Sequence, residues 1–113
     1  MKLLNLTRVF VFKKALKAWK KETGFELLGS QALVLYAIGM NGSISFLALG
    51  RYLSSFYRGM SPNELQASIK LLVGYGLINV SVVGAAHYYS LTMSGGVALA
   101  KLEERCRNTR WDK

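Results

Sequence analysis

The side chains best suited to chemistry lie between Ser61 and Leu77, where apolar and polar residues recur at helical spacing. A helix through this stretch has an apolar side formed by Leu65, Ile69, Leu72 and Val73. Its other side carries two amides, a methyl group and a cation, on Asn63, Gln66, Ala67 and Lys70. The amides and the cation can hydrogen-bond to base edges in a DNA major groove, and the methyl group can make apolar contact there. The pattern therefore predicts a recognition helix, and the alternative is the solvated side of an ordinary amphipathic helix.

The start of this helix is marked by three residues. Ser61 is suited to cap the first turn, and Pro62 stands where a missing N–H costs nothing. Glu64 follows the cap by three residues, so its carboxylate can reach back to the Ser61 N–H and complete a capping box. Ser61 is also expected to contact a DNA phosphate.

Charge and length restrict the partners and the architecture. The chain has 113 residues, of which 51% are hydrophobic, and this length supports one domain with one core. Its 15 Lys and Arg residues outnumber 6 Asp and Glu, which gives a formal charge of +9. This excess favours a polyanionic partner, either nucleic acid or an anionic membrane surface.

The titratable residues do not assemble into a catalytic or metal site. His87 is the single histidine and Cys106 the single cysteine, so no zinc site can be completed. Glu103 and Glu104 are adjacent on one helix and project in different directions, which does not make a catalytic pair. We expect no enzyme activity, no metal and no cofactor. Cys106 lies between two arginines and is either a redox sensor or a tolerated small residue.

The first 24 residues are expected to form a separate amphipathic helix, from Leu4 to Thr23. Its apolar side carries the predicted dimer contacts, which are Val9, Phe12, Leu16 and Trp19. Two alternatives are a helix folded over its own domain and a helix lying on a membrane. The chain shows no signal-peptide region and no spanning segment, so a cytoplasmic location without membrane contact is expected.

The remaining elements follow in order within a domain spanning residues 25–107. A helix over 28–40, capped by Ser30, is followed by an extended link and a second helix over 46–55, capped by Ser45. Gly50 is expected to allow a close helix approach. After the recognition helix, residues 78–82 and 87–91 alternate as a hairpin, and Thr92 caps a last helix to about Arg107. Residues 108–113 are expected to fray.

Two local sequences carry a family resemblance. The run Lys70-Leu71-Leu72-Val73-Gly74-Tyr75-Gly76-Leu77-Ile78 resembles the end of a recognition helix that turns into a wing strand. The run Leu91-Thr92-Met93-Ser94-Gly95 is similar to the Leu-Thr-x-x-Gly that closes the wing in bacterial MarR-type regulators. The resemblance implies a mainly α winged helix-turn-helix domain with a small β-hairpin and flanking N- and C-terminal helices. It also implies a cytoplasmic homodimer on double-stranded DNA, with or without a small-molecule effector. The aromatic residues near which such an effector would be held are Trp19, Tyr36, Tyr75, Tyr88 and Tyr89.

Further DNA contacts are expected around the recognition helix. Arg51 and Arg58 are natural phosphate ligands, and His87 lies near the tip of the wing. The sequence departs from the MarR-type pattern here, because residues 83–87 of the wing carry no arginine or acidic residue. Most cations precede or follow the winged domain, so the terminal helices are expected to reach phosphate, or DNA binding is weak and shared with a partner.

Three functions fit these features. The first is a sequence-specific DNA-binding transcriptional regulator, a homodimer that places residues 61–74 in the major groove. The second is a winged-helix module for protein interaction, in which the uncharged wing and apolar terminal helix contact another chain. The third is a replication or mobilisation accessory protein of a plasmid or phage, which the small size and high charge suggest.

Overall fold

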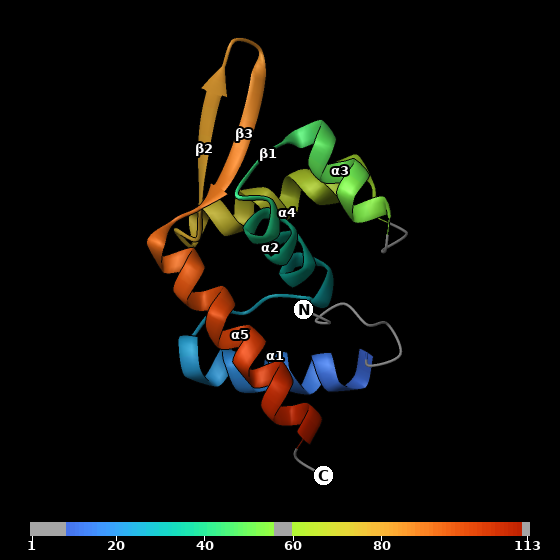
Figure 1. The fold of residues 1–113 in the computed structure, drawn as a ribbon, viewed down its shortest axis with the longest axis vertical. Helices are drawn as coiled ribbons and strands as arrows, with labels where there is room; N and C mark the ends of the chain where they lie inside the picture. Colours follow the sequence, from blue (N-terminus) through green and yellow to red (C-terminus); the bar gives the residue numbers. More distant parts are fainter. Residues whose placement is uncertain (1–8, 56–59, 112–113) are drawn as a thin grey trace.

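The computed structural model describes residues 9–55 and 60–111, with side chains described over 13–55 and 60–107. Within these ranges the elements are α1 (Val9–Thr23), α2 (Gly29–Asn41), β1 (Ser43–Ser45), α3 (Phe46–Ser54), α4 (Pro62–Gly74), β2 (Ile78–Val83), β3 (Ala86–Leu91) and α5 (Met93–Trp111). The molecule measures 50 × 27 × 21 Å, and Figure 1 shows the β2–β3 hairpin at one end and α1 at the other. The predicted winged helix-turn-helix, mainly α with a small hairpin and flanking helices, is confirmed.

Helix α2 is the centre of the core, because nearly every side of it is apolar. All residues from Ala32 to Ile38 are buried, and α3, α4, α5 and β3 all pack against it. The helix begins at Gly29, before the predicted cap at Ser30. The Gln31 side chain takes over the capping role, since its Oε1 accepts a hydrogen bond from the Leu28 N–H at 2.8 Å.

The sheet has three antiparallel strands in the order β1-β3-β2. The predicted hairpin is present, and its strands pair from Ile78 opposite Leu91 to Val83 opposite Ala86. Each strand extends one residue further towards the turn than predicted, so the turn holds two residues. Gly84 takes a φ of +61°, which two-residue hairpins require at this position. Strand β1 was predicted to be only a link. It pairs Ile44 with Tyr89 and is too short to show a period of its own.

The base of the hairpin is joined to α4 and α5 by a cluster of hydrogen bonds. The Thr92 N–H donates to the Leu77 carbonyl at 3.0 Å, and the Thr92 hydroxyl donates to the Gly76 carbonyl at 2.7 Å. The same hydroxyl accepts from the Gly95 N–H at 2.9 Å, which confirms Thr92 as the cap of α5. A Cβ on Gly95 would overlap the Leu77 carbonyl oxygen. We call Gly76, Leu77, Thr92 and Gly95 the hairpin-base junction.

The predicted close helix approach at Gly50 is absent, because a Cβ there would meet only a Leu65 methyl group at 3.9 Å. Close contacts occur instead at Gly39 of α2, where a Cβ would meet Leu99 of α5 at 2.5 Å, and at Gly95, which lies against the Leu77 backbone. On α5, Val97 is 52% exposed and Ala100 is also exposed. Ala98, Leu99 and Leu102 form the buried side, and α5 continues to Trp111, past the predicted end near Arg107.

Helix α1 packs on α5 of its own chain. Ala15, Leu16 and Trp19 belong to the common core, and the Trp19 Nε1–H donates to the Ala98 carbonyl at 2.8 Å. The Trp19 ring lies 5.9 Å from that of Phe25, which in turn lies 5.0 Å from Tyr75 at the end of α4. Packing of α1 on its own domain is one of the three arrangements expected from the sequence. None of the described helices has the length and apolarity to cross a membrane.

The two adjacent glycines of α5 give a matched test of the hairpin-base junction. Gly95→Ala should lower the free energy of unfolding by about 1–3 kcal/mol, because the new methyl group overlaps backbone. Gly96→Ala meets no atom within 4 Å and should raise it by up to about 1 kcal/mol through helix propensity. Urea unfolding measures both changes. Equal stability of the two variants would show that Gly95 is not under steric constraint.

Candidate nucleic-acid interface

Helix α4 begins with the predicted capping box. The Ser61 hydroxyl accepts from the Glu64 N–H at 3.1 Å, and the Ser61 N–H donates to Glu64 Oε1 at 2.9 Å. Pro62 occupies the first helical position. The backbone N–H groups of Ser61 and Glu64 are thus satisfied locally, and the carboxylate of Glu64 belongs to the cap.

The two sides of α4 differ as predicted, with one exception. Leu65, Ile69 and Leu72 are buried, and α4 packs against α2. Val73 was assigned to the same side, but it is 41% exposed. Ser68 completes the buried arc in its place, with its hydroxyl donating to the Glu64 carbonyl at 2.9 Å. Because its hydroxyl bonds within the helix, Ser68 is buried without an unsatisfied polar group.

The predicted base-reading residues are all open to solvent. These exposed side chains are those of Ser61, Asn63, Gln66, Ala67 and Lys70. No ion pair of Lys70 occurs within the described part of the chain. The outer side of α4 therefore offers amides and a cation that no other part of the described chain covers.

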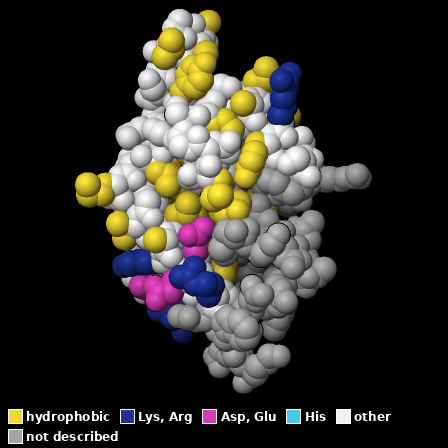
Figure 2. All heavy atoms as spheres, in the orientation of Figure 1, with side chains coloured by type: hydrophobic (Ala, Val, Ile, Leu, Met, Phe, Trp, Pro, Cys, Tyr) yellow, Lys and Arg dark blue, Asp and Glu magenta, His cyan; other side chains and the backbone are white. Residues whose placement is uncertain are grey.

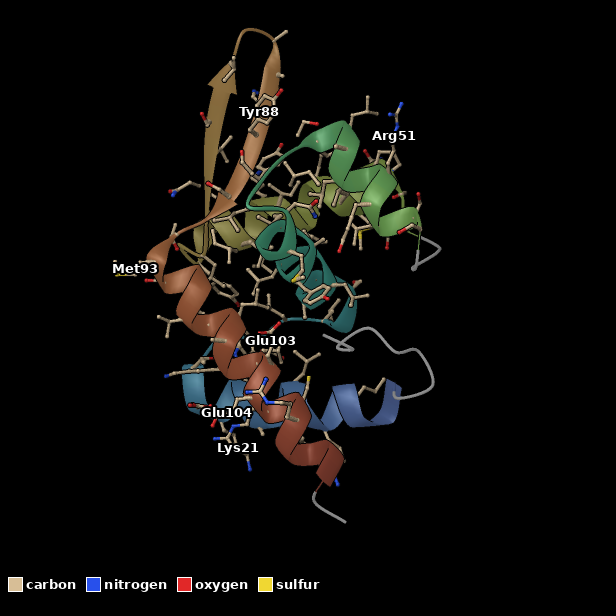
Figure 3. All side chains as sticks on the ribbon, in the orientation of Figure 1. Lys21, Arg51, Tyr88, Met93, Glu103 and Glu104 are labelled. Atoms are coloured by element: carbon tan, nitrogen blue, oxygen red, sulfur yellow. The ribbon has the colours of Figure 1, made fainter. Side chains whose placement is uncertain are left out.

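Arg51 lies on α3 between two hollows. One, of about 610 Å³, is bounded by β1, α3 and β3 and includes Tyr52 and Tyr88 in its wall. The other, of about 300 Å³, lies between α3 and the start of α4 and includes Ser61 and Leu65. Arg51 is exposed, and Figure 3 shows it extending outward from α3. Arg58, the second predicted phosphate ligand, lies outside the described residues.

The hairpin has little charge with which to hold DNA. His87 is exposed near its tip, and no Lys, Arg, Asp or Glu occurs from Ile78 to Leu91. Val82 and Val83 are 62% and 63% exposed, and Figure 2 shows hydrophobic side chains on this part of the surface. The sequence did not reveal Tyr88 as a wall of the larger hollow, because only the pairing of β1 with β3 brings it beside α3.

Two of the four predicted dimer contacts are buried within their own chain. Leu16 and Trp19 are buried against their own chain, so their side chains are not available to a second copy unless α1 moves away. The physical reason is that α5 of the same chain supplies the apolar surface that a second copy was expected to supply. The side chains of Val9 and Phe12 lie outside the described residues. Their dimer contact stays a prediction.

Cys106 is buried among core side chains, so it does not suit a redox sensor. The pKa of its thiol is raised from 9.0 to about 12, mainly by burial and also by Glu103, while Arg107 acts in the opposite direction. The arginine neighbours seen in the sequence are therefore outweighed by desolvation. The described residues contain no group of three His, Cys, Asp or Glu side chains that could hold a metal.

Comparison with solved structures identifies the fold type. The oxidised form of MarR from E. coli matches with a TM-score of 0.73, over 92% of this chain and 68% of that one, at 17% identity. A mutant MarR from E. coli complexed with operator DNA matches at 0.65, over 93% and 74%, at 16% identity. YusO from Bacillus subtilis matches at 0.70, over 95% and 74%, at 16% identity. No protein-family model and no curated protein matches the sequence. The fold is a MarR-like winged helix.

Removal of the α4 cap should destabilise the domain. Ser61→Ala is expected to lower the free energy of unfolding by about 0.5–2 kcal/mol, because the Glu64 N–H loses its acceptor. Ser61→Asp keeps an acceptor at the same position and should retain most of the stability. Thermal unfolding of the two variants provides the measurement. A loss of equal size in both would contradict a capping role.

The buried thiol gives a prediction about reactivity and pH. At neutral pH, Cys106 should react with iodoacetamide much more slowly in the folded protein than in urea, because the folded thiol is buried and protonated. The raised pKa also means that the contribution of the thiol to stability is complete below about pH 9 and is lost as the pH rises towards about 12. Equal alkylation rates with and without urea would contradict this account.

Proposed function

We propose that this MarR-like winged helix is a sequence-specific DNA-binding transcriptional regulator that places α4 in the major groove. The observation that carries the proposal is the exposed polar side of α4, held outward by the packing of Leu65, Ile69 and Leu72. Gln66 and Asn63 are suited to pair with adenine, and Lys70 with guanine or phosphate. The structural neighbour in complex with operator DNA supports the same use of the fold.

Contacts beside α4 complete the proposed interface. Arg51 and the cap residue Ser61 border the hollow between α3 and α4, where they would bind backbone phosphates. Ala67 would meet a thymine methyl group, and His87 and Arg58 would add contacts at the edges. The uncharged hairpin contributes little electrostatic attraction, so most of the affinity within the described domain depends on α3 and α4.

The regulator is further proposed to act in the cytoplasm as a homodimer, with one recognition helix for each half-site of a pseudo-palindromic DNA site. Since Leu16 and Trp19 are occupied by α5, the dimer contact would use Val9, Phe12 or another surface. A small-molecule effector stays a prediction of the family resemblance.

A protein-interaction module is the second candidate, and the hairpin favours it. Val80, Val82 and Val83 are 45–63% exposed, and Met93 beside the hairpin base is 89% exposed. Apolar residues gathered on a projecting element are typical of contacts with other proteins. This function would need no polar surface on α4.

Substitutions on α4 distinguish the two functions. In gel shifts on genomic fragments with excess random competitor, Gln66→Ala and Lys70→Ala should each reduce the affinity for the retained fragment by about 5- to 150-fold, equivalent to ~1–3 kcal/mol. Ser94→Ala, which removes an exposed hydroxyl on α5, is the control and should leave the affinity unchanged. Complexes that vanish with competitor in the wild type, or survive both α4 substitutions, would favour the interaction module.

A further inference from the structure

One side of α1 carries a row of lysines, which we call the lysine face: Lys13, Lys17, Lys20 and Lys21. Steps of three and four residues place them on the same side of the helix, and all four side chains are exposed. Four of the 15 Lys and Arg residues are thus gathered on one surface outside the proposed α4 interface.

Most of the charge on the lysine face is not neutralised. Glu26 pairs with Lys20 at 3.2 Å. The other nearby carboxylate, Glu22, is occupied from α5, by Lys101 at 3.7 Å and Arg105 at 3.0 Å. Lys13, Lys17 and Lys21 form no ion pair with any described carboxylate. Like charges at these spacings repel along a helix, so a polyanion bound there would relieve that repulsion.

The lysine face points away from the α4 interface. It lies opposite Ala15, Leu16 and Trp19, which pack inward. In Figure 1, α1 lies at the end of the molecule opposite the hairpin, and α2 lies between α1 and α4. In Figure 3, Lys21 projects beyond α1 at that same end. A duplex held by the outer side of α4 is therefore out of reach of the lysine face of the same chain.

We propose that the lysine face of α1 is a second phosphate-binding surface, which holds the backbone of a DNA segment other than the one read by α4. Lysines four residues apart rise about 6 Å along the helix and can follow a phosphate backbone without reading sequence. An anionic membrane fits less well, because the described apolar side chains of α1, those of Ala15, Leu16 and Trp19, are buried against the rest of the domain and cannot insert into a bilayer. The inference goes beyond the proposed function and does not require α4 to bind DNA.

The salt dependence of binding to a random-sequence duplex tests this surface. The measurement is made in a Gln66→Ala/Lys70→Ala background, so that α4 contributes little. Adding Lys13→Gln/Lys17→Gln/Lys21→Gln should reduce the slope of log affinity against log salt by roughly 2–3, since about 0.9 is lost for each phosphate contact. The control Lys101→Gln/Arg105→Gln/Arg107→Gln removes the same charge from α5 and should change the slope by less than about 1. Equal slopes for the two triple variants would overturn the proposal.

A capture experiment tests for a second duplex and for a membrane. With one duplex immobilised, the wild-type protein should retain a second, labelled duplex, and the Lys13/Lys17/Lys21 variant should bind the first but not the second. Tighter binding of wild-type protein to phosphatidylcholine–phosphatidylserine vesicles than to the duplex, lost in the same variant, would assign the lysine face to membranes and overturn the proposal. If α4 does not bind DNA, Gln66→Ala/Lys70→Ala alone leaves binding unchanged, and the effect of the lysine substitutions can still be read.

Discussion

The hairpin-base junction is the constraint on which the other elements depend. The chain leaves α4 through Gly76 at a φ of +76°, and within the next two residues it must start β2 and leave room for α5. Thr92 holds these segments together. Its N–H donates to the Leu77 carbonyl, and its hydroxyl donates to the Gly76 carbonyl and also caps α5. Because Gly95 has no side chain, α5 can begin directly on the Leu77 carbonyl. The hairpin, the end of α4 and the α1–α5 layer are thereby fixed to one another.

Local rules predicted much of this fold, and tertiary packing decided the rest. The capping box of α4, the sides of that helix and the hairpin follow from spacing over a few residues, and all three are present. Strand β1 forms because it pairs with β3, so its three residues alone carry no pattern from which a strand could be predicted. Val73 and Trp19 show the same limit of local rules. Whether an apolar residue is buried depends on where the neighbouring helix of the chain packs, and spacing does not give that position. The exposure of the residues proposed to read DNA could be predicted, but the hollow beside Arg51 and Tyr88 could not, since distant segments form it.

The charges are divided between two surfaces with different properties. The α4 surface combines amides with single cations at Arg51 and Lys70, which suits selective contacts but provides little general attraction. The lysine face has cations without amides, which suits attraction without selection. An uncharged hairpin leaves the first surface weakly basic. Separation of selective from general contacts would let one protein hold a specific site and a neighbouring segment together.

Selection of bound sites from random duplex DNA by the full chain tests most directly whether the outer side of α4 reads sequence. The account predicts enrichment of one motif, with adenine or guanine at the positions opposite Gln66 and Lys70, and, for a homodimer, with two-fold symmetry and half-sites about one helical turn apart. Recovery of duplexes without any shared motif after repeated rounds would contradict a sequence-reading role for α4.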